Sequence, residues 1–392
     1  MLRGPGRVTA DFLVIGGGIA GLSAASRLAA HGRLVVIEGE EALGYHSSGR
    51  SVSTSHYGIG DSVVRGLTGW SRPFFEHQPE GFSEAPISAP IASLYFADAE
   101  NEKALDALGN AMARFTDAVE EVGPEAMLRL CPVLRTGAGG AIRGLVDRSG
   151  LKLDANAMLH AFARRVRHSG GEIVTGKRIV KVERGAAGWT VTGESGESWS
   201  APILIDAAGA WADRIAALAG VRPLGLQPKR RTIIVVDPPA GMDASSWPFV
   251  HSAARDFYML PEAGQILVSP VDEVEDEPGD AQPEDYDIAL AADRLEHYTQ
   301  LKVSRVAHRW AGLRSFLADR IPTAGFAEDA PGFFWLLGQG GEGLQTAPAM
   351  AAIVESLVTG GPWPEGLEAL GVMPEHVTPG RLQKVSAQSV ES

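Results

Sequence analysis

Cysteines, long apolar runs and basic clusters are scarce or absent in this sequence of 392 residues. Cys131 is the only cysteine, which excludes an internal disulfide and a cysteine-based metal cluster and is typical of a reducing cytoplasm. No run of 18 apolar residues occurs, and residues 1–13 lack the apolar core of a signal peptide. No basic stripe is present that would neutralise nucleic-acid phosphates. We therefore expect a cytoplasmic protein without a transmembrane segment, a metal site or a nucleic-acid partner.

Acidic residues outnumber basic ones, 48 against 35, and the formal net charge is −13. Residues 271–287 alone hold nine acidic residues and no lysine or arginine, so much of the excess lies in one segment. Because runs of charge usually stay hydrated, we expect this segment to be a solvated loop rather than a partner site.

The segment 11–40 combines a glycine motif with the pattern of a dinucleotide-binding fold. Its residues predict a buried strand at 11–15, a helix at 20–30 and a second strand at 34–37. The spacing G-x-G-x-x-G between the first strand and the helix is weak alone but strong in this context. Glu38 follows the second strand, where an acid accepts hydrogen bonds from ribose hydroxyls and argues against a 2′-phosphate.

The three glycines of this motif have separate physical roles. Gly16 allows the tight turn, Gly18 lets a pyrophosphate approach the backbone, and Gly21 lets the helix pack on the strand. The first N–H groups of the helix, at Ile19 and Ala20, then face the phosphates together with the positive end of the helix dipole.

The rest of the chain alternates between two kinds of pattern. Helices are predicted at 61–77, 100–121, 153–171 and 287–302, and strands at 172–175, 178–184, 189–192 and near 202–206. Most of 221–319 alternates like antiparallel strands, whereas 333–358 returns to a strand, a glycine loop and a helix. This pattern predicts an α/β fold (α+β in two domains), in which a nucleotide-binding domain of three separated pieces carries an inserted antiparallel sheet.

The proposed boundaries follow these changes of pattern. The nucleotide-binding domain comprises residues 8–85, 150–219 and 320–375, the inserted domain residues 86–149 and 220–319, and the C-terminal tail residues 376–392.

Four motifs carry a family resemblance: GGGIAG at 16–21, GYHSSGRS at 44–51, LIDAAGAWAD at 204–213 and LGQGGEGLQTAP at 337–348. Their order and spacing resemble the FAD-dependent D-amino-acid oxidase and dehydrogenase superfamily, the DAO family. With VRPLGLQPKRR and WAGLRSFLAD, the chain looks most like the D-arginine dehydrogenases and related D-amino-acid dehydrogenases. The resemblance implies a glutathione-reductase-like Rossmann FAD domain and an inserted antiparallel-sheet substrate domain.

The resemblance also assigns the residues that would hold FAD. Beyond the first motif and Glu38, these residues belong to segments that would approach the cofactor. They are Gly49, Arg50, Ser51, Ile179, Ala208, Gly209, Gly312, Gly340, Gly341, Gly343, Leu344, Gln345 and Thr346. The late glycine loop would present N–H groups and a helix N-terminus to the flavin, which stabilises the reduced anion. Cys131 is far from the late motifs in sequence, so FAD is expected to be non-covalent.

The substrate site is expected around two strand arginines. The resemblance implies that Arg314 clamps the substrate carboxylate, with Arg231 and the hydroxyl of Tyr258 beside it, because a guanidinium fork matches a carboxylate. On a strand, Lys229 and Arg231 share one face and Arg230 points to the other. His56 would either bond the substrate or hold its loop by backbone contacts.

The chain also departs from the arginine-preferring dehydrogenases. Those enzymes hold the substrate guanidinium with an acid in the segment aligned with 91–96, where this chain has Ser93 and no carboxylate. Thr54 and Ile59 stand where the family brings histidine and tyrosine. Because a buried guanidinium without an anion is costly, neutral or apolar D-amino acids should be preferred over D-arginine. Glu342, in place of an aromatic residue, is the one acid that would restore cation binding.

These inferences predict a flavin-dependent D-amino-acid dehydrogenase, with oxidase activity left open. A D-amino acid would give its α-hydride to flavin N5, and the imino acid would hydrolyse to a 2-oxo acid and ammonia. The alternatives are a relative that oxidises glycine, sarcosine, a cyclic imino acid or a 2-hydroxy acid, and a non-catalytic FAD-binding protein. The electron acceptor, whether a quinone, a dye or oxygen, is left open by the sequence.

Overall fold

The segment 11–40 forms the expected strand, helix and strand in the computed structural model, which describes residues 7–382. These elements are β2 (Phe12–Ile15), α1 (Ile19–Leu28) and β3 (Leu34–Ile37). Every residue of both strands is buried, as apolar strands covered on both faces require. Gly18 occupies the N-cap of α1 and provides no side-chain cap, so the first N–H groups of this helix need other partners.

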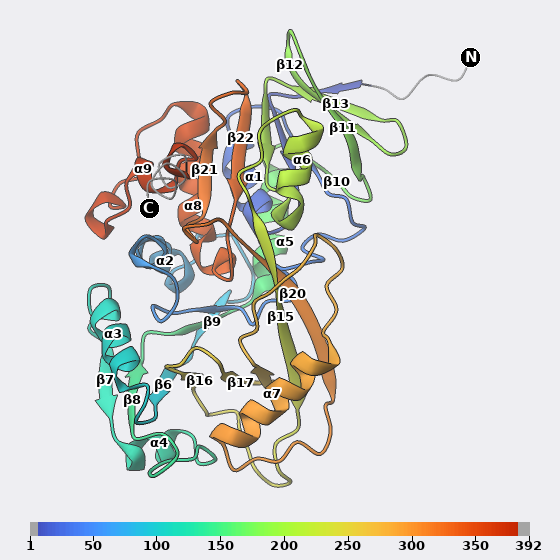
Figure 1. The fold of residues 1–392 in the computed structure, drawn as a ribbon. Coiled ribbons are helices and arrows are strands. Elements are labelled where there is room, and N and C mark those ends of the chain that lie inside the picture. The colour runs from blue at the N-terminus through green and yellow to red at the C-terminus, as the bar shows by residue number, and fades with distance from the viewer. Residues whose placement is uncertain (1–6, 383–392) are drawn as a thin grey trace, which may run out of the picture.

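A six-stranded sheet forms the centre of the upper half of the molecule in Figure 1. Its order is β10-β3-β2-β14-β22-β21, and all neighbours are parallel except β21 and β22. The added strands are β10 (Glu172–Val174), β14 (Ile203–Asp206), β21 (Thr323–Phe326) and β22 (Phe333–Leu337). Segments far apart in the sequence therefore complete one sheet, because parallel neighbours require crossover connections.

Two layers cover this sheet. On one face α1 packs against α5 (Ala155–His168) and α8 (Gly343–Thr359), and Asp154 caps α5 by accepting from the N–H of Ala157 at 2.8 Å. The apolar core on this face includes Leu22, and α2 (Ser62–Glu76) extends it against α8. The opposite core lies under a four-stranded sheet of β1 (Arg7–Thr9), β13 (Ser198–Ala201), β12 (Gly188–Gly193) and β11 (Ile179–Gly185).

A nine-stranded, mostly antiparallel sheet fills the lower half of Figure 1. Its path is β19-β15-β18-β17-β16-β6-β8-β7, and β20 pairs with β15 along nine residues of each strand. The strands are β6 (Ser93–Ala97), β7 (Val119–Val122), β8 (Arg143–Asp147), β15 (Gln227–Val236), β16 (Phe249–Ser252), β17 (Tyr258–Glu262), β18 (Gln265–Ser269), β19 (Val274–Glu275) and β20 (His308–Phe316). The long strands β15 and β20 reach up toward the six-stranded sheet, which carries their residues to the boundary between the halves.

The remaining elements lie around these sheets. They are α3 (Glu102–Met112), α4 (Pro124–Leu130), α6 (Ala212–Leu218), α7 (Asp285–Tyr298), α9 (Pro374–Val377), the 3-10 turns η1 (Gly209–Trp211) and η2 (Glu368–Leu370), and a small sheet of β4 (Thr54–Ser55), β9 (Leu151–Leu153) and β5 (Ser88–Pro90). Within residues 7–382, none of the helices has the length and apolar character needed to cross a membrane.

The structure corrects two predictions from the sequence. The helix expected at 100–121 ends at Met112, and Val119–Val122 forms strand β7 instead, paired with β8. The acidic segment 271–287 is not a simple solvated loop, because Asp272 and Asp287 are buried and form ion pairs with arginines of β15. Charge complementarity with a distant strand holds these acids inside.

The C-terminal tail expected at 376–392 is packed in its first part. Arg381 pairs with Asp319 at 2.7 Å and donates to the carbonyl of Ile321 at 2.6 Å. Residues 383–392 of that tail lie outside the described residues.

Candidate functional site

Three adjoining cavities run between the six-stranded and nine-stranded sheets. The nucleotide cavity is lined by Glu38 and Ile179, among others, and the central cavity by the first turn of α1 and the loop before α8. The distal cavity reaches from Arg314 toward α2 and α3. Neighbouring cavities share lining residues: Gly18 belongs to the first two, and Arg314 to the last two. The arrangement forms one continuous path from β3 to the lower sheet.

The nucleotide cavity lies at the carboxyl ends of β2, β3 and β14. Glu38 accepts from the N–H of Gly17 at 2.6 Å and from the N–H of Glu40 at 2.8 Å, so its carboxylate is held at the cavity wall. A carboxylate oxygen accepts more than one hydrogen bond, so ribose hydroxyls can donate to it as well. Gly16 has φ 110°, and a Cβ there would lie 2.3 Å from the carbonyl oxygen of Ala207. Only glycine fits this approach.

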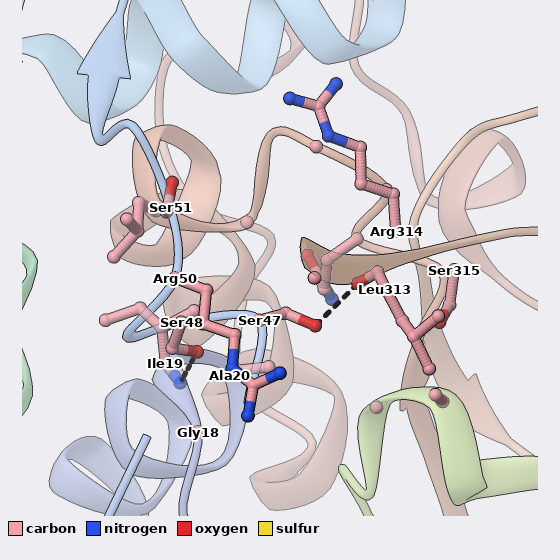
Figure 2. Close-up of a pocket in the computed structure, with 18 of the residues that line it drawn as sticks. Gly18, Ile19, Ala20, Ser47, Ser48, Arg50, Ser51, Leu313, Arg314 and Ser315 are labelled. Atoms are coloured by element: carbon pink, nitrogen blue, oxygen red, sulfur yellow. Dashed lines mark hydrogen bonds between the residues drawn. The ribbon is translucent and has the colours of Figure 1, made fainter. Parts of the chain in front are cut away.

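The central cavity surrounds the N-terminus of α1, as Figure 2 shows. The hydroxyl of Ser48 accepts from the N–H of Ile19 at 3.0 Å, and the hydroxyl of Ser47 donates to the carbonyl of Leu313 at 2.5 Å. These two bonds tie the 44–51 loop to both α1 and β20. The helix N-terminus therefore faces a cavity of the kind that receives phosphate groups.

Arg50 lies in the central cavity but is already paired. Its guanidinium forms an ion pair with Asp280 and donates to the carbonyls of Ala281 and Ala311, each at 3.1 Å. In Figure 2 the guanidinium groups of Arg50 and Arg314 point toward opposite ends of the cavity. Arg50 therefore fastens the acidic segment beside the cofactor path, and its charge is largely offset by Asp280.

The flavin end of the central cavity is lined by glycine backbone and two buried polar atoms without partners. Gly312, Gly340, Gly341 and Gly343 lie there with Leu344. The hydroxyl of Tyr258 and the Nε2 of Gln339 are buried and have no hydrogen-bond partner among residues 7–382. Buried polar groups are normally satisfied, so these two indicate a polar ligand in the cavity. The set of residues fits FAD from the ribose end to the flavin.

Several predicted residues support the site from behind rather than line it. A Cβ at Gly21 would lie 2.0 Å from the carbonyl oxygen of Gly16, and one at Gly49 would lie 2.6 Å from that of Gly44. The hydroxyl of Thr346 bonds the carbonyl of Glu342 within α8 at 3.0 Å. Among the residues of the three cavities, Gly21, Gly49 and Thr346 do not occur. They shape the loops whose other residues line the cavities.

Gln345 and Ser93 differ more clearly from their predicted roles. The side chain of Gln345 accepts from the N–H of His56 at 3.1 Å and donates to the hydroxyl of Thr68 at 2.9 Å, so it is committed to the protein. Ser93 is buried in β6 and lies outside the three cavities. Tyr95, two residues further along the strand, lines the distal cavity instead.

Arg314 and Arg231 form a cationic pair where the central and distal cavities meet. The half-buried guanidinium of Arg314 lies against Gly341, where a Cβ would be 2.7 Å from Nη1, and it has no ion pair among residues 7–382. Arg231 is buried and donates from Nε to the carbonyl of Asp272 at 2.8 Å. Burial and then the charge of Arg314 lower the pKa of Arg231 to about 10, while Tyr258, Asp272 and Glu273 oppose the shift. Arg314 is thus the cation free to take an anionic ligand.

The opposite face of β15 confirms the alternation expected from the sequence. Arg230 points away from the cavity and pairs with Asp287 at 3.0 Å, Asp276 at 3.3 Å and Glu284 at 2.9 Å. Its neighbour Arg231 faces the cavity, as a strand period of two residues requires.

A neutral histidine lies in the wall of the distal cavity. The Nδ1 of His56 accepts from the N–H of Gly58 at 3.2 Å and lies 2.8 Å from the hydroxyl of Tyr95, so its proton is on Nε2. Burial, followed by the charges of Arg65 and Arg314, lowers the pKa of His56 to about 4. The ring of His251 stacks on Tyr95 with centroids 4.8 Å apart. This aromatic cluster offers the cavity neutral donors and acceptors at pH 7.

Two further predicted residues line the distal cavity. Thr54 lies in β4, and Glu342 is the N-cap residue of α8. Glu342 accepts from the N–H of Gly341 at 2.8 Å. Its pKa is raised by burial, while Arg314 opposes the shift. The acid therefore lies near the guanidinium of Arg314, where the two side chains line the same cavity.

Sequence reasoning missed four residues of this site: Tyr95, His251, Gln339 and Arg65. Gln339 lies inside the late glycine motif at 337–348, so its neighbouring glycines were a usable signal. Tyr95, His251 and Arg65 belong to three segments that only the tertiary fold brings to one cavity. No local sequence pattern predicts that these three segments line one cavity.

The low pKa of His56 predicts a pH-dependent stability. Between pH 6.5 and about 4 the unfolded histidine binds a proton that the folded one does not, so the free energy of unfolding falls as the pH falls. From pH 7 to pH 5 the wild type should lose about 2 kcal/mol more than His56→Gln. Urea unfolding of both proteins at the two pH values measures this difference. Equal losses in the two proteins would contradict it.

The position of Cys131 predicts releasable FAD. This thiol is fully buried in the core of the lower sheet, outside the three cavities, and burial raises its pKa to about 12. Acid precipitation of the holoprotein should leave a colourless pellet and a yellow supernatant, and Cys131→Ser should behave identically. A yellow pellet would contradict non-covalent binding.

Comparisons with known proteins agree with this geometry. The sequence model of the FAD dependent oxidoreductase family, DAO, matches residues 11–357. A tRNA 5-methylaminomethyl-2-thiouridine biosynthesis bifunctional protein, MnmC, from Burkholderia pseudomallei is 26% identical over 90% of this chain, which covers 57% of that protein. The chain thus spans little more than half the length of this curated relative.

Solved structures share the fold. An L-alpha-glycerophosphate oxidase from Mycoplasma pneumoniae with FAD bound has a TM-score of 0.80 and 20% identity. The match covers 90% of this chain and 95% of the oxidase chain. An L-proline dehydrogenase from P. horikoshii also has a TM-score of 0.80 and 20% identity. The match covers 96% of this chain and 99% of the dehydrogenase chain. At this identity the likeness establishes the fold.

Proposed function

The chain belongs to the DAO family of FAD-dependent oxidoreductases, and on this premise we propose that it oxidises D-amino acids at the α-carbon. The observation that carries the proposal is the guanidinium of Arg314, which has no ion pair within the described part of the chain and lies at the junction of the flavin end and the distal cavity. A cation in this position binds the carboxylate of an amino acid and thereby fixes its α-carbon beside the flavin. D configuration rests on the family resemblance of the motifs.

The residues of the site have distinct parts in the proposed reaction. Arg314 binds the α-carboxylate, Arg231 adds positive potential behind it, and the free hydroxyl of Tyr258 donates a hydrogen bond to the same group. FAD, when bound, would supply the acceptor for the α-hydride and its electron pair. As the hydride leaves, the lone pair of the neutral amine forms the C=N bond, and the imino acid is released and hydrolyses to a 2-oxo acid and ammonia.

The neutral state of His56 suits this chemistry. At neutral pH the imidazole carries no charge that would bind the substrate carboxylate away from Arg314. Its role is to hold the loop through Gly58 and Tyr95 and to line the cavity.

We propose that one half of the molecule binds FAD and the other binds the substrate. Residues 8–85, 150–219 and 320–375 would bind FAD, and residues 86–149 and 220–319 would bind the substrate. The strand β20 then carries Arg314 from the substrate half to the flavin.

D-arginine should be a poor substrate, because Ser93 supplies no carboxylate where the arginine-preferring relatives have one, and five arginines already line the distal cavity with Glu342 and three other acids. A dye-coupled assay of D-arginine, D-methionine, D-phenylalanine and D-leucine tests this proposal. Glycine, sarcosine, L-proline and a 2-hydroxy acid in the same panel test the alternatives within the family. A kcat/KM for D-arginine tenfold above the other D-amino acids would overturn the substrate proposal.

A further inference from the structure

A second cationic group lies in the distal cavity, apart from the carboxylate clamp. Arg65, in the first turns of α2, is 6% exposed and lines this cavity. Its Nε donates to the carbonyl of Tyr57 at 2.7 Å, and no carboxylate lies within ion-pair distance of it among residues 7–382. A buried guanidinium of this kind is costly unless an anion completes its environment.

Arg255 brings another positive charge to the same place. It lies in the turn between β16 and β17, lines the distal cavity and has φ 59°, a left-handed conformation that a non-glycine residue rarely adopts. Its side chain has no partner among the described residues. Burial lowers the pKa of Arg65, and the charge of Arg255 lowers it further, while Asp61 opposes both. Both side chains line the same cavity, so one ligand there can meet both guanidinium groups.

The clamp and this second group share one cavity. Arg314, Arg65 and the neutral imidazole of His56 all line the distal cavity. The α3 side of the cavity is lined by small or apolar side chains, Ala104, Ala107, Leu108 and Ala111, together with Asn101. Four acids, Asp61, Glu273, Asp319 and Glu342, also line the cavity. Arg314, Arg65 and Arg255 form no ion pair among residues 7–382, so an extended chain with an anion at each end would meet an unpaired guanidinium at both ends.

We propose that the distal cavity selects amino acids whose side chains end in an anion, a carboxylate or a phosphate, which binds at Arg65 and Arg255. This inference rests on the proposed function, since the α-carboxylate of the same molecule binds Arg314. It departs from the sequence-based expectation of neutral or apolar substrates, because it favours acidic ones. The exclusion of D-arginine is kept, because its side chain would meet two cations.

Kinetics with matched pairs of substrates test the selection. D-Glutamate, D-2-aminoadipate and D-phosphoserine are compared with D-glutamine, D-norleucine and D-serine, so that the carboxylate and phosphate arms are separate. We expect kcat/KM for at least one acidic substrate to exceed that of its neutral partner by about tenfold or more, as for a charged hydrogen bond. Arg65→Gln and Arg255→Gln should each remove most of this advantage by lowering kcat/KM for the acidic substrates more than for their neutral partners. Arg65→Lys, which keeps the charge, should retain part of it.

Arg148→Gln is the matched control for these variants. Arg148 is exposed on the lower half, pairs with Glu120 and does not line the distal cavity, so its loss changes the net charge equally. Arg255 is exposed, so Arg255→Gln is expected to fold normally. It therefore tests the second anion site even if the Arg65 variants fail to fold. Equal rates for both members of every pair, or equal losses on both in the arginine variants, would overturn the inference.

A binding measurement separates this inference from the proposed function. Glutarate and adipate cannot be oxidised, but their binding beside the flavin should shift its absorption spectrum at concentrations about tenfold lower than butyrate and hexanoate require. If the dicarboxylates bind tightly in an Arg65-dependent manner and no amino acid reduces the flavin, the second anion site stands and the proposed reaction fails. If amino acids reduce the flavin and the second carboxylate gives no gain in binding, the second site fails alone.

Discussion

Replacing Arg314 with methionine should lower kcat/KM for every amino-acid substrate by about 10²–10³-fold, since truncating one partner of a desolvated charge pair costs about 2–5 kcal/mol. Arg314 is the one cation at the junction of the two cavities that has no ion pair within residues 7–382. Its loss leaves the carboxylate unclamped and the α-carbon free to move away from the flavin, so kcat should fall as well as affinity. Steady-state kinetics of protein with matched FAD content measure the effect.

Arg309→Met is the control for this variant. Arg309 lies on the same strand, β20, but is exposed and does not line the three cavities. It should keep the kcat/KM of the wild type within about twofold, as surface substitutions usually do. A full-strength Arg314→Met enzyme would show that the carboxylate is bound elsewhere.

Adding one methyl group at Gly21 should abolish FAD binding or prevent folding. Its Cβ would lie 2.0 Å from the carbonyl oxygen of Gly16 and 3.3 Å from the side chain of Val14. The helix α1 must then move away from β2, which displaces the N–H groups that face the pyrophosphate. Overpacking of this kind costs about 1–3 kcal/mol or more, so Gly21→Ala should be purified without yellow colour or melt at a clearly lower temperature.

Gly123→Ala provides the matched control. Gly123 has φ −90° and ψ 179°, which any residue adopts, and no atom lies within 4 Å of the position that a Cβ would occupy there. This variant should retain full FAD content and an unchanged melting temperature. If Gly21→Ala behaved like Gly123→Ala, the close contact of α1 with the first loop would not be needed for the cofactor.

Local patterns predict the elements that depend on neighbouring residues. The strand predicted at 34–37 is confirmed at both ends, because an apolar run between turn signals is buried on both faces. The cap of α5 at Asp154 and the opposite faces of Arg230 and Arg231 follow from helix and strand geometry. The helix predicted at 100–121 is too long because β7 owes its strand form to β8, which lies further along the chain.

Burial of charge is beyond the reach of the sequence. The acidic segment 271–287 contains acids that reach Arg50, Arg214, Arg230, Arg231 and Arg320 in four different parts of the chain. Each acid alone indicates a hydrated loop, and only the tertiary fold supplies the cations that hold it.

In the candidate site, too, some features follow from local sequence and others depend on the tertiary fold. Glycine spacing predicts the cofactor path, because tight turns and close approaches demand glycine wherever they occur. The distal cavity is predicted less well: Ser93 lies outside it, while Tyr95, His251 and Arg65 converge there from three elements. Specificity depends on this convergence, which no local pattern records.

The most direct test of the central claim is the reduction of the bound flavin by amino acids in the absence of oxygen. The holoprotein is mixed with each D-amino acid and its L enantiomer, and the loss of the oxidised flavin absorbance is followed in a stopped-flow instrument. We predict complete bleaching by at least one D-amino acid, at a rate that Arg314→Met lowers by about 10²-fold or more, and slower reduction by the L enantiomer. A fully FAD-loaded protein that no amino acid bleaches would contradict the proposed function.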